Sequence, residues 1–184
     1  MTLEQKLDIL VQLVLRARTF FDLWWIYESV ETRPKYLPAM KRYSEFFRFD
    51  SHALLVAYTI YLCQIFEYRP KTLNIKHVVN EAKTRGLSTG YITAAEQVLQ
   101  EGLPIWKKLV IVRSNLFAHR SLSLSYSRAF ERANMAPNEI RHLAELGLEG
   151  INSLRTALGQ QDYEFSTWAG KNLRKLLEEI NPSS

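Results

Sequence analysis

Apolar side chains recur at helical spacing from the start of the chain. In residues 3–28 they stand mostly three or four positions apart, which is the period of an amphipathic helix. The apolar positions include Leu7, Leu10, Val11, Val14, Phe21 and Trp24. Thr2 and Gln5 form a capping-box pattern at the start of this stretch. We therefore predict a long first helix that ends near Glu28.

The rest of the chain divides into apolar stretches separated by turn residues. Residues 31–38 contain two prolines and are predicted to form a loop, and residues 52–68 are apolar on nearly every side, which predicts a central helix capped by Asp50 or Ser51. Further helices are predicted over residues 75–84, 89–100, 105–120, 137–159 and 166–180. Asn74 is the expected cap of the first of these, and Gly86 closes it.

Two segments do not fit this helical pattern. Glu101-Gly102-Leu103-Pro104 is expected to end the helix predicted over residues 89–100, because glycine and proline both weaken helices. Serines and leucines alternate over residues 121–127, which we interpret as an extended loop because no other stretch offers a partner strand. Residues 128–132 are expected to form a helical turn. The sequence thus predicts an all-α fold, with residues 1–184 forming a single helical domain.

The composition agrees with an all-α globular fold and gives a first indication of possible partners. The chain is 47% hydrophobic and 23% charged, with seven glycines and six prolines in 184 residues, which is typical of a globular helical protein. The net charge of +5 is compatible with a polyanionic partner but also with a basic soluble surface. The cluster Phe20, Phe21, Trp24 and Trp25 has core spacing, so we interpret it as core or dimer contact rather than as a base-stacking platform.

Several classes of chemistry are not indicated. The single cysteine, Cys63, lies in an apolar run and is interpreted as a core residue, and no His/Cys/acid cluster has metal-ligand spacing. We therefore expect neither a metal site nor a cofactor. The longest apolar run, residues 53–66, is shorter than the roughly 20 residues of a membrane span. The amino terminus has no signal-peptide pattern, so we expect a cytoplasmic protein that does not bind membranes.

Residues 107–120 combine a core-like apolar pattern with unexpected polar side chains. At about 100° per residue, Arg113 points into the same arc as its apolar neighbours. Those neighbours are Leu109, Val110, Leu116 and Phe117. An arginine in such an arc needs a partner, which can be an internal carboxylate such as Glu67, another subunit or a bound phosphate.

His119 and Asn115 stand four residues apart and share a helical face. An ideal helix separates Arg113 from His119 by about 120°, so the sequence leaves open whether their side chains meet. Taken alone, His119 is better interpreted as a hydrogen-bonded, half-buried histidine than as a catalytic one. The combination of the two residues in one helix carries more information than either alone.

The segment Arg-Ser-Asn-Leu-Phe-Ala-His-Arg, residues 113–120, resembles the motif of the HEPN superfamily (higher eukaryotes and prokaryotes nucleotide-binding domain). That motif is an arginine followed, after four to six residues, by a histidine, and five intervene here. The wider layout is similar to the abortive-infection AbiU-like branch over roughly residues 3–160. The shared features are the long first helix, a central helix ending in Phe66-Glu67, Ala-His-Arg-Ser at residues 118–121 and a long helix over residues 137–159.

The resemblance implies a HEPN-like bundle of about four core helices plus short accessory helices, which forms a homodimer with the two motifs facing each other across a cleft. It also implies metal-independent RNA cleavage of a phage-defence or toxin type, with an antitoxin protein as a further partner. His119 would move the proton and Arg113 would hold the phosphate, with Asn115 as an orienting group. The RNA-binding residues would be Arg120, Lys107, Lys108 and Ser114.

Two alternatives stand beside this expectation. Family members often carry Asn or Asp directly after the arginine, where this chain has Ser114, and this departure favours a non-catalytic HEPN module that binds a nucleotide or a partner protein. The second alternative is a structural helical protein in which Arg113 is only a salt-bridged strut.

Overall fold

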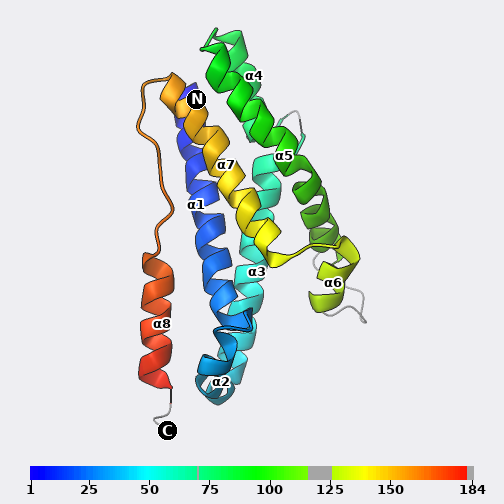
Figure 1. Ribbon diagram of the computed structural model, residues 1–184, viewed down its shortest axis with the longest axis vertical. Helices are drawn as coiled ribbons and strands as arrows, with labels where there is room; N and C mark the ends of the chain where they lie inside the picture. The colour runs from blue at the N-terminus through cyan, green and yellow to red at the C-terminus, as the bar shows by residue number, and fades with distance from the viewer. Residues whose placement is uncertain (70, 116–125, 182–184) are drawn as a thin grey trace.

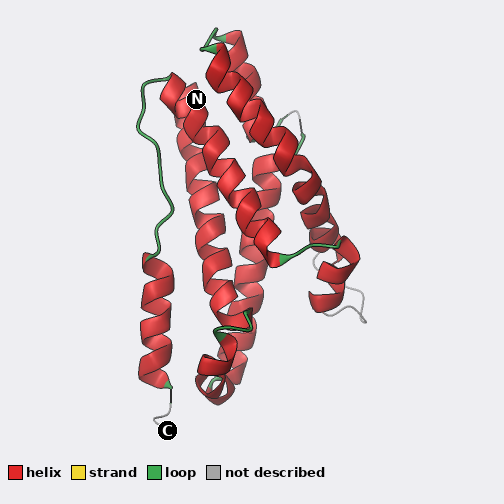
Figure 2. Ribbon diagram, viewed as in Figure 1, coloured by secondary structure: helices red, strands yellow, loops and turns green. Residues whose placement is uncertain are grey.

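The computed structural model describes residues 1–69, 71–115 and 126–181. Over these residues the chain forms α-helices and no strand (Figure 2), so the all-α prediction is confirmed. The helices are α1 (Leu3–Glu28), α2 (Arg33–Arg42), α3 (Ser44–Phe66), α4 (Ile75–Thr84), α5 (Thr89–Arg113), α6 (Tyr126–Ala133), α7 (Pro137–Ala157) and α8 (Trp168–Ile180).

Four helices form the core of the molecule. α5 packs most extensively on α7 and α1 on α3, and further contacts between α1 and α7 and between α3 and α5 close the ring. Figure 1 shows consecutive core helices running in opposite directions, with α6 beside the end of α5 and α8 alongside α1. The expectation of about four core helices plus short accessory helices is therefore confirmed.

The first helix begins and ends as its sequence predicts. The Thr2 hydroxyl accepts a bond from the Gln5 backbone N–H at 3.3 Å, and the Gln5 side chain accepts one from the Thr2 N–H at 2.9 Å. This reciprocal capping satisfies two of the N–H groups that a helix leaves unpaired at its start. α1 ends at Glu28, so both predicted bounds are confirmed.

The loop predicted over residues 31–38 is wrong, because α2 occupies most of it. Pro34 lies in the first turn of α2, where a helix needs no backbone donor. α3 also begins earlier than predicted, at Ser44. Asp50 and Ser51 do not cap it but tie it to α1: Asp50 accepts a bond from the Tyr27 hydroxyl at 2.8 Å, and Ser51 donates one to Glu28 at 2.9 Å.

The break predicted at residues 101–104 is also wrong, because α5 runs through it without interruption. Gly102 is a packing residue rather than a helix breaker: a Cβ placed on it would lie 2.7 Å from Cε1 of Phe66. Its missing side chain lets α5 approach the end of α3 closely. Pro104 lies on the exposed side of α5, so only one backbone bond of the helix is lost there.

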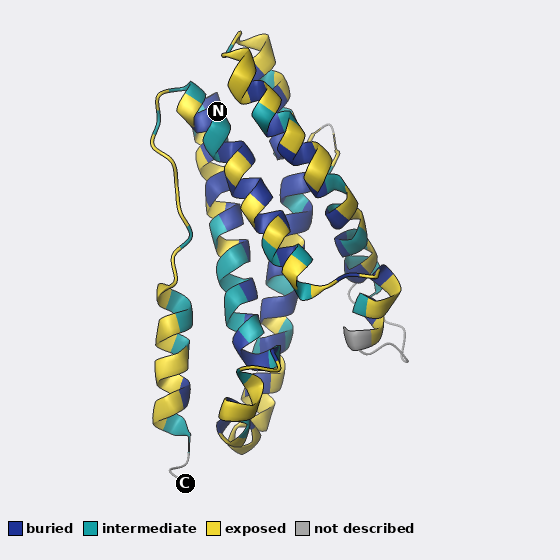
Figure 3. Ribbon diagram, in the orientation of Figure 1, coloured by how far each residue is buried: buried dark blue, intermediate teal, exposed yellow. Residues whose placement is uncertain are grey.

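The aromatic cluster of α1 belongs mainly to the core. Phe21 and Trp24 are buried, and both rings pack edge-on against Tyr58 of α3 at 5.6 and 5.5 Å between centroids. Phe20 and Trp25 are half-buried at its margin. Figure 3 shows the buried positions on the inner faces of α1, α3, α5 and α7.

α3 is long and apolar enough to cross a membrane by length and composition. Half of its most apolar window is buried inside the bundle, and the core helix of a soluble protein meets the same two criteria. The property therefore carries no membrane assignment.

The α3–α4 junction and the carboxyl-terminal half follow the predicted pattern closely. Asn74 caps α4, its side-chain oxygen accepting a bond from the His77 N–H at 2.8 Å, and Gly86 follows the helix with a φ of 72°. The helical turn expected over residues 128–132 lies inside α6, and α7 begins at Pro137 as predicted. The Ser166 hydroxyl accepts a bond from the Trp168 N–H at 3.2 Å at the start of α8.

Candidate functional site

The carboxyl-terminal end of α5 carries the arginine that the sequence singles out. Leu109 and Val112 are buried and fix this end of the helix against the core. Arg113, one residue further on, retains 31% of its side-chain exposure. It therefore lies at the edge of the core, where its guanidinium is within reach of solvent.

Arg113 has an acidic neighbour at the end of α3. Its Nη1 lies 3.9 Å from Oε1 of Glu67, the carboxylate that the sequence offers as an internal partner. The same oxygen lies closer, at 2.9 Å, to Nε of Arg69. Glu67 is largely buried, with 18% of its side chain exposed.

This three-residue cluster has a surplus of positive charge. Two guanidinium groups share one carboxylate oxygen, and the shorter contact belongs to Arg69. Arg113 is thus only partly neutralised, since a contact of 3.9 Å is too long for a good hydrogen bond. An anion that reached this corner of the bundle would meet a positive charge already held in place.

The two lysines of the predicted RNA-binding set differ in their surroundings. Lys107 is exposed, whereas Lys108 lies 2.6 Å from the carboxylate of Glu139 at the start of α7. Burial raises the pKa of Glu139, but the Lys108 ammonium and the Ala136 backbone N–H outweigh it and leave that pKa below its usual range. The charge of Lys108 is therefore compensated inside the protein, and that of Lys107 is not paired with any acid among the described residues.

The helix leaves α geometry directly after Arg113. Ser114 and Asn115 form a π-helical turn, a rare conformation that is found frequently at functional sites. The Asn115 side chain donates a bond to the Ile111 carbonyl at 2.9 Å, so one of its two amide N–H donors is used within its own helix.

Two of the predicted residues, His119 and Arg120, lie outside the described residues, as do residues 121–125 of the predicted extended loop. The last two residues of that loop, 126 and 127, belong to α6, so the prediction is wrong there. Of the predicted site residues, the structure thus places Arg113, Ser114, Asn115, Lys107 and Lys108 on the last turns of one helix. Their proposed roles stay predictions.

Other candidate groups have ordinary structural surroundings. Cys63 is buried, and that burial raises the pKa of its thiol to about 12, so it carries no thiolate near neutral pH. His142 lies at the surface, with its Nε2 2.9 Å from the Glu101 carboxylate. Among the residues that the structure describes, no three His, Cys, Asp or Glu side chains are grouped so that they could hold a metal ion.

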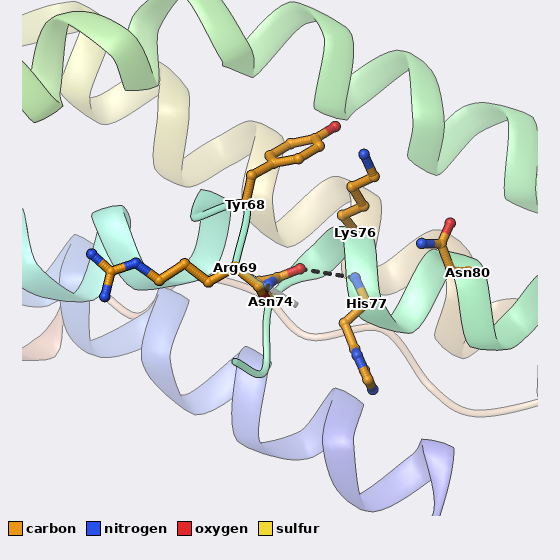
Figure 4. Close-up of a pocket in the computed structure, with 6 residues that line it drawn as sticks. All are labelled: Tyr68, Arg69, Asn74, Lys76, His77 and Asn80. Atoms are coloured by element: carbon orange, nitrogen blue, oxygen red, sulfur yellow. Dashed lines mark hydrogen bonds between the residues drawn. The ribbon is translucent and has the colours of Figure 1, made fainter. Parts of the chain in front are cut away.

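Sequence reasoning missed the polar residues around the α3–α4 junction. Arg69 shares the Glu67 carboxylate with Arg113, and it also lines a surface pocket of about 330 Å³ (Figure 4). In the sequence this junction is only a proline-containing turn between two helices. No local pattern there signals a pocket, because its walls come from residues on both sides of the turn.

Comparison with known proteins supports the family suggested by the motif. The sequence model of the AbiU2 family of HEPN proteins matches residues 2–180 of the chain. Neither the curated proteins nor the solved structures contain a match. The matched region spans the whole bundle, so the chain belongs to the AbiU2 family of HEPN proteins.

Proposed function

We propose that the protein is a metal-independent endoribonuclease of abortive-infection or toxin type, which cuts RNA with Arg113 and His119 at the cleft of a homodimer. The proposal places it in the cytoplasm, with RNA as substrate and an antitoxin protein as a regulatory partner. It rests on membership of the AbiU2 family and on the chemistry available at the end of α5.

The observation that supports it most is the incomplete pairing of Arg113. A purely structural arginine at the margin of a core is expected to have its charge and its donors satisfied by close partners. Among the residues that the structure describes, Arg113 has one acidic neighbour, at 3.9 Å, and that neighbour contacts Arg69 more closely. Within the described part of the chain, its fork of N–H donors makes no close ion pair and can bind a phosphate in two-point fashion.

The chemistry that follows needs no metal. A ribose 2′-oxygen attacks the adjacent phosphorus, the bond from phosphorus to the 5′-oxygen breaks, and the products are a 2′,3′-cyclic phosphate and a 5′-hydroxyl. One imidazole takes the proton of the 2′-hydroxyl and another gives a proton to the 5′-oxygen. Because one histidine cannot perform both steps at once, two copies of His119 facing each other would supply both, which is why the proposal requires a dimer.

Arg113 would act on the phosphate in this scheme. Negative charge builds up on the non-bridging oxygens as the fifth bond to phosphorus forms, and a fixed guanidinium stabilises that charge more than it stabilises the starting phosphate. Lys107 and Arg120 would attract the RNA backbone electrostatically. Lys108 would contribute less, since Glu139 already compensates its charge.

The test is cleavage of a mixed RNA substrate in EDTA by protein whose mass in solution has been measured. Wild type is compared with His119→Ala and with the matched control His142→Ala, which changes a surface histidine outside the motif. We expect the wild-type protein to be a dimer and its cleavage products to end in cyclic phosphate. Cleavage should be lost in His119→Ala and unchanged in His142→Ala. Cleavage that survives His119→Ala would contradict the proposal, as would a folded dimer that cuts no RNA.

A second function is favoured by one specific feature. Ser114 stands where related proteins often carry Asn or Asp, and Asn115 uses its amide within its own helix. Both features fit a non-catalytic module that binds a nucleotide or a partner protein. Saturable binding of RNA or nucleotide by wild type, with no cleavage under any of the conditions above, would establish this function instead.

A further inference from the structure

Two hollows meet at the junction of α3 and α4, on either side of the pair formed by Tyr68 and Lys76. The first, called here the polar pocket, has a volume of about 330 Å³ and is lined by Tyr68, Arg69, Asn74, Lys76, His77 and Asn80. Every one of these side chains is polar, and none is acidic. The second, called here the adjoining pocket, has a volume of about 180 Å³ and shares Tyr68, Lys76 and Asn80 with the first.

The floor of the adjoining pocket is apolar. Val79 and Leu99 are buried beneath it, and Leu103 completes this floor from α5. Its acidic member, Glu96, lies 2.6 Å from Lys83 and is therefore already paired. One hollow is thus polar and basic, and its neighbour has an apolar surface, with an aromatic ring between them.

Lys76 is available to a ligand. Its Nζ lies 3.8 Å from the centroid of the Tyr68 ring, and among the described residues it has no carboxylate partner. Tyr68 is 48% exposed, so its ring remains accessible beside the lysine. In Figure 4 these two side chains extend to the same side of the junction, whereas Arg69 extends sideways, away from both. Nε of Arg69 lies 2.9 Å from Oε1 of Glu67.

The third basic residue of the polar pocket, His77, is engaged like Arg69. The His77 ring turns away from Lys76 in Figure 4, and its Nε2 lies 3.3 Å from Nζ of Lys6, which in turn pairs with Glu81 at 2.6 Å. Any anion in the pocket would therefore be held mainly by Lys76, with hydrogen-bond donors from the Asn80 amide. This leaves a site with one lysine that has no carboxylate partner among the described residues, one aromatic face and one hollow with an apolar floor.

This combination matches the chemistry of a nucleotide. A phosphate seeks a cation and amide donors, and a base seeks an aromatic face and an apolar surface; single-stranded nucleic acid is recognised in this way, largely independently of sequence. Binding to a membrane or a peptide would require neither an aromatic ring between the pockets nor the division into a polar and an apolar hollow.

The pocket is also connected to the proposed catalytic corner. Nε of Arg69 and Nη1 of Arg113 both contact the same Glu67 oxygen, so the two guanidinium groups lie side by side. RNA held at Arg113 would therefore pass the α3–α4 junction within a short length of chain. From this placement we infer that the junction binds one nucleotide of the RNA substrate beside the cleavage point, with the phosphate on Lys76 and the base against Tyr68.

This inference rests on the proposed function, since it takes RNA as the ligand, but it can be tested without cleavage. The probe is a fluorescein-labelled single-stranded oligonucleotide with 2′-O-methyl sugars, which lacks the attacking hydroxyl and stays intact. Binding is followed by fluorescence anisotropy over a series of salt concentrations, with full-length protein. The variants are Lys76→Ala, Tyr68→Ala and Tyr68→Phe, and the matched control is Lys83→Ala, a lysine of the same helix whose charge Glu96 already compensates.

We expect Tyr68→Ala to weaken binding about five-fold or more, the loss typical of one stacked base. Lys76→Ala should weaken binding and lower the salt slope by about one, as expected for one lost phosphate contact. Tyr68→Phe, which keeps the ring, and Lys83→Ala should bind as wild type does. Binding by Lys76→Ala and Tyr68→Ala that equals wild type would overturn the inference.

The outcomes separate this inference from the nuclease proposal. If wild type cleaves RNA and the junction variants neither weaken binding nor raise KM, the nuclease stands and the junction site is wrong. If binding depends on Lys76 and Tyr68 but no RNA is ever cut, the junction site stands and the nuclease is wrong. A competition experiment with adenosine monophosphate tests whether the junction binds a free nucleotide instead of RNA. Saturable binding of adenosine monophosphate without binding of the oligonucleotide would overturn the assignment to RNA.

Discussion

Two arginines at helix ends of this bundle have very different surroundings. Arg155, on the last turn of α7, is 6% exposed and pairs through Nη1 with Asp8 of α1. Its Nε donates to the Gln161 carbonyl at 3.1 Å, and its guanidinium lies 4.6 Å from the centre of the Tyr163 ring. Arg113, on the last turn of α5, has one acidic neighbour among the described residues, at 3.9 Å.

The difference separates a structural arginine from one that is available for binding. Arg155 joins α7, α1 and the segment that follows α7, and its donors are used inside the protein. Arg113 lies beside Arg69, which makes the closer contact to their shared carboxylate. Loss of Arg155 should therefore affect stability, and loss of Arg113 should affect function.

The sharpest challenge to this comparison is Arg113→Ala. If Arg113 stabilises charge on the scissile phosphate, its removal should slow cleavage about 100-fold or more. The free energy of unfolding should change by less than about 1 kcal/mol, because the ion pair is long and partly exposed. Single-turnover cleavage and urea denaturation measure the two effects, with Arg16→Ala, an exposed arginine of α1, as the control. A strongly destabilised variant would instead identify Arg113 as a strut.

The reciprocal variant is Arg155→Ala. It removes an ion pair and a buried hydrogen bond, so we expect a loss of about 2 kcal/mol in the free energy of unfolding. Hydrogen exchange should rise in residues 158–167, which Arg155 helps to hold, while cleavage per folded molecule stays at the wild-type rate. Arg155→Lys keeps the charge near Asp8 but loses the bond to Gln161. Its free energy of unfolding should therefore lie between those of wild type and Arg155→Ala. Unchanged stability in Arg155→Ala would remove the basis of the comparison.

Glu67→Gln sharpens the comparison by removing the carboxylate that Arg113 and Arg69 share. The positive surplus at this corner then increases, and RNA affinity should rise about two- to five-fold at low salt, the range of one partly exposed charge pair. Titration of an uncleavable RNA at two salt concentrations tests this. A variant that loses stability and gains no affinity would show that Glu67 serves only to hold the two arginines.

The smallest expected effect concerns Lys108 and the acid that compensates it. The pKa of Glu139 is lowered in the folded protein, so the stability that this carboxylate contributes is present above its ordinary pKa and is lost as the pH falls through the lowered value. We expect wild type to lose about 0.5 kcal/mol more than Glu139→Gln on acidification through this range. Urea denaturation of both proteins between pH 6 and about pH 3 measures the difference. Parallel loss in the two proteins would contradict the assigned ion pair.

Much of the fold could be predicted from local pattern. The capping box at Thr2, the Asn74 cap and the apolar period of α1 and α7 all depend on residues a few positions apart, so the sequence alone carries them. The predictions at α2 and at residues 101–104 failed because proline and glycine were taken as breaks. Pro34 lies in the first turn of α2, where a helix needs no backbone donor. Position 102 has no room for a side chain because the Phe66 ring of α3 lies against it, and no local pattern reveals this contact between two helices.

The candidate site likewise has features that are set by the local sequence and features that are set by contacts between helices. The sequence by itself determined the family, the all-α fold and the Arg-x5-His motif, because these are set by residue type and spacing along one chain. Only the tertiary structure decided that Glu67 is shared by Arg113 and Arg69, that Lys108 is compensated by Glu139 while Lys107 is not, and that two pockets meet at Tyr68 and Lys76. Charge compensation depends on distances between side chains from different helices, and those distances exist only once the bundle has packed.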